Sequence, residues 1–430
     1  LFALLMFSPL GLLADPGSDA PTGTEVGSPM ENETLKASSA GNFGDAPYAN
    51  AVAGKLESVT MAASSATEEC AKNIIPIILS ADNNFAPLMY ITMFSILKNA
   101  NENTFCDFYL LIHPNFEQRY KDEITKLGEK YNNCKITFID MGTAFTDVIP
   151  GGYPAAAYYR LATANLLPNY TKCLYLDVDI LVLHDLGDLY NIDIDSCYIA
   201  GMKDMGIADS EWFSQWFSHY IKFDLQIPDP YQYINSGVLL MNLDLIRKDG
   251  LTEKLTSVAK HGIDGQRPFS FADQDVWNKV CLGRIKFLDP EWNVFSHLLL
   301  ILEKSQEYYK KAGIIFGKKQ FEKACINPCI VHFAGPKPWA NPSQPYADEW
   351  WEYARQTPFY GELSAKIQPK QTSKGPLKRI LHRRYPVQGQ REQNAAKQRQ
   401  STAKAKIIGK TNPRRPSPHH QKLHSTAPQH

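Results

Sequence analysis

The stretch IIPIILSADNNFAPLMYITMFSIL, residues 74–97, establishes the pattern of the fold. Its first six residues predict a buried strand, in which Pro76 must lie at the start or at an unpaired position because it has no backbone N–H. A polar turn over residues 80–84 follows and leads into a helix. The apolar residues that predict this helix are Leu88, Ile91, Met93, Phe94 and Leu97.

The same alternation continues along the chain. Residues 107–112 and 135–140 predict two further strands, and the charged segment 117–131 between them predicts a helix. Strands that alternate with helices indicate an α/β fold with a mostly parallel, Rossmann-like sheet flanked by helices. Ligands of such sheets bind beyond the carboxyl ends of the strands. The sequence has no GxGxxG or Walker A loop, which disfavours a dinucleotide oxidoreductase or a P-loop phosphotransferase.

Composition divides the chain into four segments. The 430 residues are 44% hydrophobic, enough for one large or two ordinary domains. Residues 1–14 are apolar and resemble the hydrophobic part of a signal peptide or are an artefact, and residues 15–72 predict a disordered linker. Residues 73–365 form the expected single folded domain, followed by a basic tail over residues 366–430. The eight cysteines include no CxxC pair, so we expect buried free thiols.

The net charge of zero conceals an asymmetry. From Ile367 onward there are 15 basic residues against the single acid Glu392, so the tail carries +14 and the body −14. Residues 376–385 predict a short amphipathic basic helix that would bind an anionic membrane surface, where each Lys or Arg adds about 1 kcal/mol. Beyond Gln388 we expect disorder. No aromatic residue follows Tyr385, so a nucleic-acid partner is not expected.

Two carboxylates separated by one residue follow an apolar run at Asp177-Val178-Asp179. Residues i and i+2 of a strand share a face, so both carboxylates can hold one Mn²⁺ or Mg²⁺ ion while Val178 turns toward the core. The spacing recurs at Asp193/Asp195 and Asp273/Asp275, so the motif alone does not identify the site.

Six ordered motifs distinguish among these pairs. The chain resembles retaining glycosyltransferases of family 8, most closely the bacterial lipopolysaccharide galactosyl- and glucosyltransferases, over roughly residues 73–362. The resemblance implies the GT-A fold and a UDP-sugar donor. It is carried by SADNNF (80–85), YRL (159–161), LYLDVD (174–179), NSGV (235–238), DQD (273–275) and HFAGPKPW (332–339).

The resemblance implies that Asp177, Asp179 and His332 bind Mn²⁺, with Mg²⁺ as the second candidate. Imidazole beside carboxylates favours manganese over calcium. The alternative for His332 is a core histidine, although the Gly-Pro-Lys-Pro-Trp loop that follows it favours the metal ligand. Lys337 would supply a point charge to the diphosphate, and Gly335 would permit close backbone approach to it.

The nucleotide-sugar contacts are also implied by the resemblance. Asp82 would bind the uracil N–H, and its alternative role is to cap the following helix. Asn235 would bind the donor sugar, with turn formation by Asn-Ser-Gly as the alternative. The full predicted set is Ser80, Ala81, Asp82, Asn84, Phe85, Arg160, Asp177, Val178, Asp179, Asn235, Gly335 and Lys337.

The catalytic candidates are Asp273, Gln274 and Asp275, which are expected at the start of a helix. By resemblance, Asp273 binds sugar hydroxyls and Gln274 lies beneath the anomeric carbon, while Asp204 would contact the acceptor. An amide is a poor nucleophile, which favours front-face attack by the acceptor. Asp275 remains the alternative nucleophile of a double displacement.

The predicted function is retaining transfer of galactose or glucose from UDP-galactose or UDP-glucose to a saccharide or lipid-linked saccharide, most consistent with the lipopolysaccharide core. A metal-dependent nucleotide-sugar hydrolase and a non-catalytic sugar-binding module are the alternatives. In a bacterium the enzyme would be cytoplasmic and peripheral on the inner membrane. A genuine signal at residues 1–14 would instead indicate a secretory route.

Overall fold

The computed structural model describes residues 73–367, apart from residues 149–150, 205–216, 218 and 300–305. The expected apolar leader, the linker and nearly all of the basic tail lie outside the described residues.

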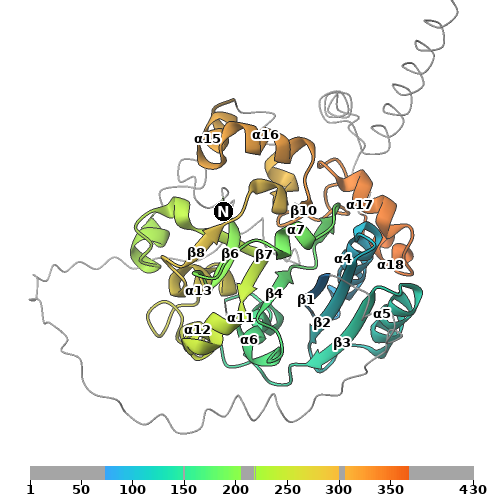
Figure 1. The fold of residues 1–430 in the computed structure, drawn as a ribbon, viewed down its shortest axis with the longest axis horizontal. Coiled ribbons are helices and arrows are strands. Elements are labelled where there is room, and N and C mark those ends of the chain that lie inside the picture. The colour runs from blue at the N-terminus through green and yellow to red at the C-terminus, as the bar shows by residue number, and fades with distance from the viewer. Residues whose placement is uncertain (1–72, 149–150, 205–216, 218, 300–305, 368–430) are drawn as a thin grey trace, which may run out of the picture. The chain divides into compact units, whose positions relative to one another are not determined.

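A seven-stranded sheet forms the centre of the fold, in the order β3-β2-β1-β4-β7-β6-β8 (Figure 1). Strands β1 to β4 are parallel, β7 is antiparallel to both of its neighbours, and β6 is parallel to β8. The mostly parallel α/β sheet predicted from the sequence is therefore confirmed. Its strands are β1 (Asn73–Ala81), β2 (Thr104–Ile112), β3 (Cys134–Asp140), β4 (Lys172–Leu176), β6 (Ile199–Lys203), β7 (Ile234–Asn242) and β8 (Ile285–Phe287).

The first half of the sheet follows the predicted alternation, with α4 (Ala86–Asn99) after β1 and α5 (Gln118–Lys130) after β2. Successive residues of β1 enter two different core clusters, Ile77 on one face and Ile78 on the other, so the strand is buried on both sides. Pairing of β1 with β4 begins at Ile77, the residue after Pro76. Pro76 is the fourth residue of β1 and is in register with Asp107 of β2, so it lies inside the strand and is unpaired only on the β4 side.

A second, three-stranded sheet brings a distant segment to the end of β4. Strand β10 (Ile330–His332) lies between β5 (Ile180–Val182), to which it is antiparallel, and β9 (Val294–Phe295), to which it is parallel. Its last residue, His332, is paired with Ile180. This register places His332 beside the aspartate pair.

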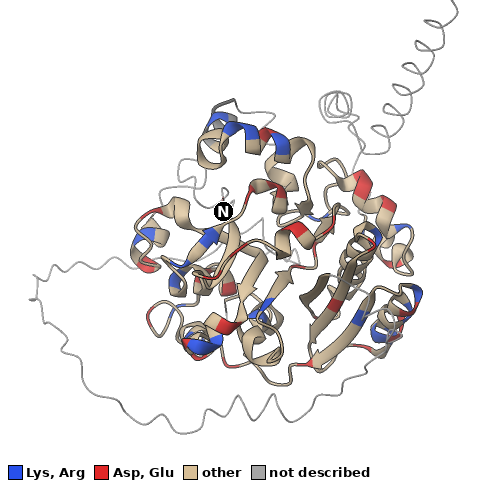
Figure 2. Cartoon of the chain, viewed as in Figure 1, with Lys and Arg blue, Asp and Glu red and all other residues tan. Residues whose placement is uncertain are grey.

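Helices flank the sheet and carry most of the charge. Lys and Arg are frequent on α15 and α16, whereas the central strands are largely uncharged (Figure 2). Of the helices in the described residues, none is both long and apolar enough to cross a membrane. The remaining α-helices are α6 (Thr163–Leu166), α7 (Gly187–Tyr190), α11 (Leu243–Lys248), α12 (Leu251–His261), α13 (Ala272–Val280), α15 (Gln306–Phe316), α16 (Lys318–Ile326), α17 (Ala347–Ala354) and α18 (Tyr360–Ala365).

The seven cysteines among the described residues are free thiols, five of them buried, as expected from their spacing. Cys70 lies outside the described residues.

Candidate active site

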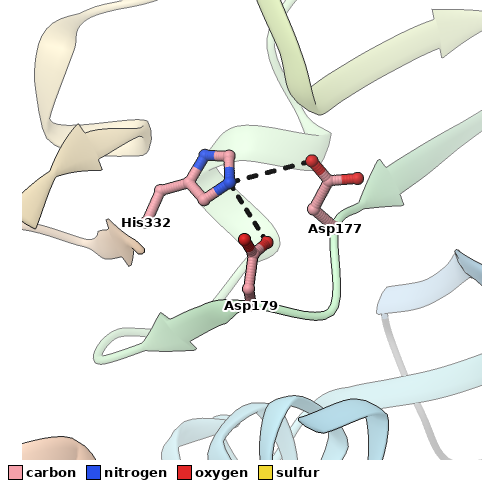
Figure 3. A group of neighbouring side chains, drawn as sticks. All are labelled: Asp177, Asp179 and His332. Carbon is pink, nitrogen blue, oxygen red and sulfur yellow. Dashed lines mark ion pairs between the residues drawn. The ribbon is translucent and has the colours of Figure 1, made fainter. Parts of the chain in front are cut away.

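Asp177, Asp179 and His332 face one another at the carboxyl end of β4 (Figure 3). His332 Nε2 lies 3.2 Å from Asp179 Oδ1 and 3.7 Å from Asp177 Oδ2. The three candidate ligand atoms all lie within 4.8 Å of one another. Two carboxylate oxygens and one imidazole nitrogen fit a divalent cation such as Mn²⁺ or Mg²⁺.

The two aspartates converge in a way that differs from the sequence-based expectation. They lie in the turn between β4 and β5 rather than within a strand, so the turn, not the strand pleat, aims both carboxylates at His332. Thr92 in α4 fixes this turn with its single hydroxyl proton, which the carbonyl oxygens of Val178 and Ile180 share at 2.8 and 3.0 Å. The Val178 side chain lies in the core, as expected.

Lys337 lies in the loop that follows β10 and contacts the same cluster. Its Nζ is 2.5 Å from Asp179 Oδ2 and donates to the Phe333 carbonyl oxygen at 2.9 Å. Burial alone would raise the pKa of Asp179, but Lys337 and His332 outweigh it and hold this pKa well below its usual range. Asp179 is therefore ionised at neutral pH, as a metal ligand must be.

Arg160, in the 3₁₀ turn Tyr159–Ala162, joins this cluster to the helix α13. Its guanidinium is 2.8 Å from Asp177 Oδ1 and 3.1 Å from Asp273 Oδ2, and it stacks over the Tyr175 ring at 4.0 Å. Burial would lower the pKa of Arg160, but the two carboxylates raise it overall. The sequence predicted contact with the nucleotide or sugar; the structure shows a buried bridge between two acidic groups.

The segment Asn235-Ser236-Gly237 lies inside strand β7, between β4 and β6. This corrects the expectation that it precedes a strand, and it rules out the turn that its composition suggested. Asn235 Oδ1 accepts from the Gly237 backbone N–H and from Asn293 Nδ2, both at 2.9 Å. Its Nδ2 donates to Gln274 Oε1 at 2.9 Å and to Asp204 Oδ2 at 3.3 Å.

There is no room for a side chain at Gly237. The backbone of this residue is not in the left-handed region, but a Cβ atom there would lie 2.3 Å from His332 Cε1 and 2.6 Å from Asp177 Oδ2. Contacts below 3.0 Å do not occur for real Cβ atoms. We call Asp177, Asp179 and His332 the metal-type cluster. Strand β7 can approach this cluster so closely only because Gly237 has no side chain.

The first turn of α13 carries Asp273, Gln274 and Asp275, as expected, and all three are buried. Asp273 accepts from the Ser236 hydroxyl at 2.9 Å. Burial raises the pKa of Asp273 to about 7 although Arg160 opposes the rise. Gln274 Oε1 accepts from Asn235 Nδ2 and from the Ser236 backbone N–H at 3.1 Å, which occupies both of its lone pairs.

Asp275 is bound by a different set of groups from those around Asp273 and Gln274, which it meets through the Tyr233 hydroxyl. It accepts hydrogen bonds at 2.5 Å from the hydroxyls of Tyr220 and Tyr233 and at 2.8 Å from the Phe271 backbone N–H. Burial raises its pKa to about 6, although these hydrogen bonds partly offset the effect. The carboxylate is completely inaccessible to solvent. Asp275 therefore links α13 to Tyr220 and Tyr233, and both of its oxygens already accept hydrogen bonds.

Asp204 follows β6 and is buried in the same network. Its Oδ2 accepts from Asn235 and from Gln274 Nε2, each at 3.3 Å. The predicted acceptor residue therefore lies next to the predicted sugar-binding and catalytic residues.

The predicted uridine-binding loop lies beyond the carboxyl end of β1. In the parallel pair β1–β4, Ile78 is paired with Tyr175, so the loop after β1 and the turn after β4 leave the same edge of the sheet. Asp82 Oδ1 accepts from the backbone N–H groups of Asn84 and Phe85 at 2.9 and 3.2 Å. Both the structural and the binding interpretation of Asp82 are thus compatible with the geometry, because Oδ2 makes only a 3.5 Å contact with the Asn84 amide.

The third aspartate pair lies elsewhere. Asp193 and Asp195 are exposed, and Asp193 Oδ1 accepts from the Asp195 backbone N–H at 2.9 Å. This pair forms a surface turn of the chain.

Three residues of the site were not among the predicted site residues. Ser236 and Gly237 belong to the NSGV motif, of which only Asn235 was assigned a role, and Asn293 is an isolated asparagine after Trp292. Asn293 Oδ1 lies 2.9 Å from His332 Nδ1, which makes it the partner of the ring nitrogen that faces away from the aspartates. Only the pairing of β9 with β10 brings Asn293 to this place.

Sequence comparison relates this chain to known proteins. The model of the family described as "Glycosyl transferase family 8" matches residues 76–342. General stress protein A of Bacillus subtilis (strain 168) is 28% identical over 66% of this chain and 94% of its own length. Lipopolysaccharide 1,2-glucosyltransferase of Escherichia coli (strain K12) is 25% identical over 64% of this chain and 74% of its own.

Two solved structures have a similar fold. The galactosyltransferase LgtC in complex with donor and acceptor sugar analogs has a TM-score of 0.54 at 20% identity, covering 67% of this chain and 100% of that one. The bifunctional glycosyltransferase WbbM has a TM-score of 0.59 at 23% identity, covering 69% of this chain and 52% of that one. These likenesses confirm the GT-A type of fold.

Proposed function

Since the chain belongs to glycosyl transferase family 8, we propose that it transfers galactose or glucose from a UDP-sugar to a saccharide acceptor with retention of the anomeric configuration. The observation that carries this proposal is that two kinds of group lie next to each other. One is the cluster of Asp177, Asp179 and His332, and the other is the set of buried amides and carboxylates around Gln274. The first suits a diphosphate with its cation, and the second suits the hydroxyl groups of a sugar.

The donor would lie across the carboxyl ends of β1 and β4. Asp82 would accept from the uracil N–H, with the backbone of Ser80 and Ala81 and the side chains of Asn84 and Phe85 holding the base and ribose. Asp82 is only partly buried and its Oδ2 makes only the one long contact within the loop, which supports this role. The Ser80 hydroxyl already donates to the Ala156 carbonyl oxygen at 2.7 Å, so its backbone is the part that is available.

The diphosphate would lie between the metal-type cluster and the loop that contains Gly335 and Lys337. A bound Mn²⁺ or Mg²⁺ ion supplies positive charge that neutralises the diphosphate and stabilises UDP as a leaving group. Lys337 adds a second positive charge at the same place, since its ammonium group already lies against Asp179. Arg160 holds Asp177 in position from the buried side.

Front-face attack agrees best with the hydrogen bonding of the two candidate nucleophiles. The Gln274 carbonyl oxygen has both lone pairs occupied, and the Asp275 carboxylate is buried and accepts three hydrogen bonds. Neither group is free to form a covalent bond to the sugar. The acceptor hydroxyl would therefore attack from the side of the leaving UDP, whose phosphate oxygen takes the proton. Asp273 and Asn235 would orient the donor sugar, and Asp204 the acceptor.

The acceptor is proposed to be a saccharide of the lipopolysaccharide core or another lipid-linked saccharide. One relative is named lipopolysaccharide 1,2-glucosyltransferase, which supports this class. The basic tail over residues 366–430, which is almost wholly outside the described residues, would hold the enzyme at the anionic cytoplasmic face of a membrane where such acceptors lie.

Release of UDP measures this function directly. The purified chain is incubated with UDP-galactose or UDP-glucose, with and without truncated lipopolysaccharide cores, in Mn²⁺, Mg²⁺ or a chelator. We expect cation-dependent UDP release that an acceptor accelerates, and loss of at least about 100-fold in Asp179→Ala. UDP release that is insensitive to the chelator or to Asp179→Ala would refute the metal-dependent proposal. Release that no acceptor accelerates, with free hexose as the product, would instead indicate a nucleotide-sugar hydrolase.

A further inference from the structure

Three side-chain amides, Asn293, Asn235 and Gln274, form a row of hydrogen bonds that runs from His332 to the buried carboxylate of Asp204. We propose that Asn293 is a positioning residue, which holds the His332 ring in the tautomer whose Nε2 lone pair faces Asp177 and Asp179. This inference rests on the metal role proposed for His332. It gives a function to an asparagine that neither touches the aspartates nor belongs to any recognised motif.

The row is anchored by the backbone of β7. The Gly237 N–H lies 2.9 Å from the Asn235 side chain, and the Ser236 N–H lies 3.1 Å from the Gln274 side chain. A backbone N–H can only donate, so each amide must turn its carbonyl oxygen toward it. Residues 235–237 lie between paired positions of β7, Ile234 with β6 and Val238 with β4, and the Gly237 carbonyl oxygen accepts from the Asp177 backbone N–H at 2.7 Å. These contacts hold the two N–H groups in place. The orientation of Asn235 is therefore determined by the strand.

The orientation of the Asn235 amide fixes the orientation of Asn293, and Asn293 in turn determines which nitrogen of His332 carries the proton. The Asn235 oxygen faces Asn293 at 2.9 Å, so Asn293 must present its NH₂ group there and its oxygen on the other side. That oxygen lies 2.9 Å from His332 Nδ1, which must then carry a proton. In a neutral imidazole, Nε2 is then unprotonated and is free to act as a ligand. Nε2 is the nitrogen that faces Asp177 and Asp179.

The hydrogen bond between Asn293 and His332 is buried. Asn293 is fully inaccessible to solvent, and His332 is 2% exposed. Burying an amide costs free energy unless all of its groups are hydrogen-bonded, and an apolar residue of similar size would fill the same space without that cost. The nearby Phe295 packs its ring edgewise against His332 at 5.6 Å. The asparagine therefore serves a chemical purpose.

Two substitutions separate the positioning role from a structural one. Asn293→Leu keeps the approximate volume and removes both hydrogen bonds. Asn293→Asp keeps an oxygen for His332 Nδ1–H but cannot donate to Asn235. Asn242→Leu is the matched control, because Asn242 is a half-buried asparagine at the far end of β7 whose hydrogen bonds go to Leu245 and Ile194.

Two readouts are independent of transferase activity. Long-range ¹⁵N NMR of the ring nitrogens, recorded above the ordinary range of histidine titration, reports which nitrogen carries the proton. The His332 signals are assigned by their loss in His332→Gln. Electron paramagnetic resonance of free Mn²⁺ during titration, in the presence of UDP, reports the metal affinity. A protein that binds Mn²⁺ and UDP but transfers no hexose would refute the proposed function and leave this inference standing.

We expect the proton on Nδ1 of His332 in the wild type and in Asn293→Asp. In Asn293→Leu we expect a population protonated on Nε2 and a Kd for Mn²⁺ that is roughly 10- to 100-fold higher. Asn293→Asp and Asn242→Leu should stay within about threefold of the wild-type Kd. An Nε2 proton in the wild type, or an unchanged tautomer and affinity in Asn293→Leu, would overturn the inference. So would an equal loss of affinity in Asn242→Leu.

Discussion

Replacing Gly237 by alanine tests how closely β7 approaches the metal-type cluster. The added Cβ would lie 2.3 Å from His332 Cε1, whereas ordinary van der Waals contact begins at 3.4 Å. Strand β7 is held close to this place, because Val238 pairs with β4, Ile234 pairs with β6, and the Gly237 carbonyl oxygen accepts from the Asp177 N–H at 2.7 Å. The His332 ring must therefore move by about 1 Å, and the ring carries both the ligand nitrogen and the nitrogen bound to Asn293.

The expected cost follows from this displacement. Forcing one extra methyl group into a filled site costs about 1–3 kcal/mol in the free energy of unfolding. A misplacement of about 1 Å at a catalytic group costs on the order of 100-fold in turnover. Gly237→Ala should therefore fold, unfold at a lower denaturant concentration, bind Mn²⁺ at least about tenfold more weakly, and release UDP on the order of 100-fold more slowly.

Gly201→Ala in β6 is the matched control for this variant. Its Cβ would lie 2.5 Å from Ile234 Cδ1, the end of a flexible side chain, and only in ordinary contact, at 3.4 Å, with the Asn235 backbone oxygen. None of the three candidate metal ligands is among its neighbours. We expect a similar or smaller loss of stability with nearly unchanged Mn²⁺ affinity, measured by denaturant unfolding and by Mn²⁺ titration. The reasoning is refuted if folded Gly237→Ala keeps wild-type affinity and turnover, or if Gly201→Ala loses as much of both.

Three further substitutions test separate parts of the site. Lys337→Met removes the charge beside the diphosphate, so kcat for UDP release should fall by roughly 10- to 1000-fold with the fold intact; unchanged kcat would exclude that role. Asp82→Asn keeps an oxygen for the Asn84 N–H but loses the charge, so KM for the UDP-sugar should rise about tenfold or more while stability changes little. Burial raises the pKa of Asp275 to about 6, so the folded chain retains a proton that the unfolded chain releases. Its contribution to the unfolding free energy should fall as the pH rises from about 4 to about 6, by at most about 3 kcal/mol relative to Asp275→Asn; a constant difference between the two curves would contradict this.

The parts of the fold that depend on local pattern could be predicted from the sequence. Residues 74–140 alternate between aliphatic runs and helical periodicity, and the structure follows that alternation strand by strand. The aspartate pair at 177 and 179 is equally local, and only its position in a turn rather than a strand was missed. Its true partner, His332, was identified by the family resemblance.

The parts that depend on distant contacts could not be predicted in this way. Asn, Ser and Gly are turn formers by local propensity, yet Asn235, Ser236 and Gly237 lie in a central strand, where hydrogen bonds from distant residues such as Arg160, Asp177 and Gln274 hold their backbone. Gly237 is required by the nearness of His332, which is almost a hundred residues away along the chain. Asn293 has no local signature, since its role exists only once β9 and β10 are paired.

The central claim is that Asp177, Asp179 and His332 hold one divalent cation against the diphosphate of a nucleotide. Electron–nuclear double resonance of Mn²⁺ bound to the protein with UDP tests it most directly, because coupled nuclei identify what touches the ion. The account predicts ³¹P coupling from UDP and ¹⁴N coupling from one imidazole on the same Mn²⁺, with the ¹⁴N coupling lost in His332→Gln. Absence of the nitrogen coupling in the wild type, or its persistence in His332→Gln, would contradict the account.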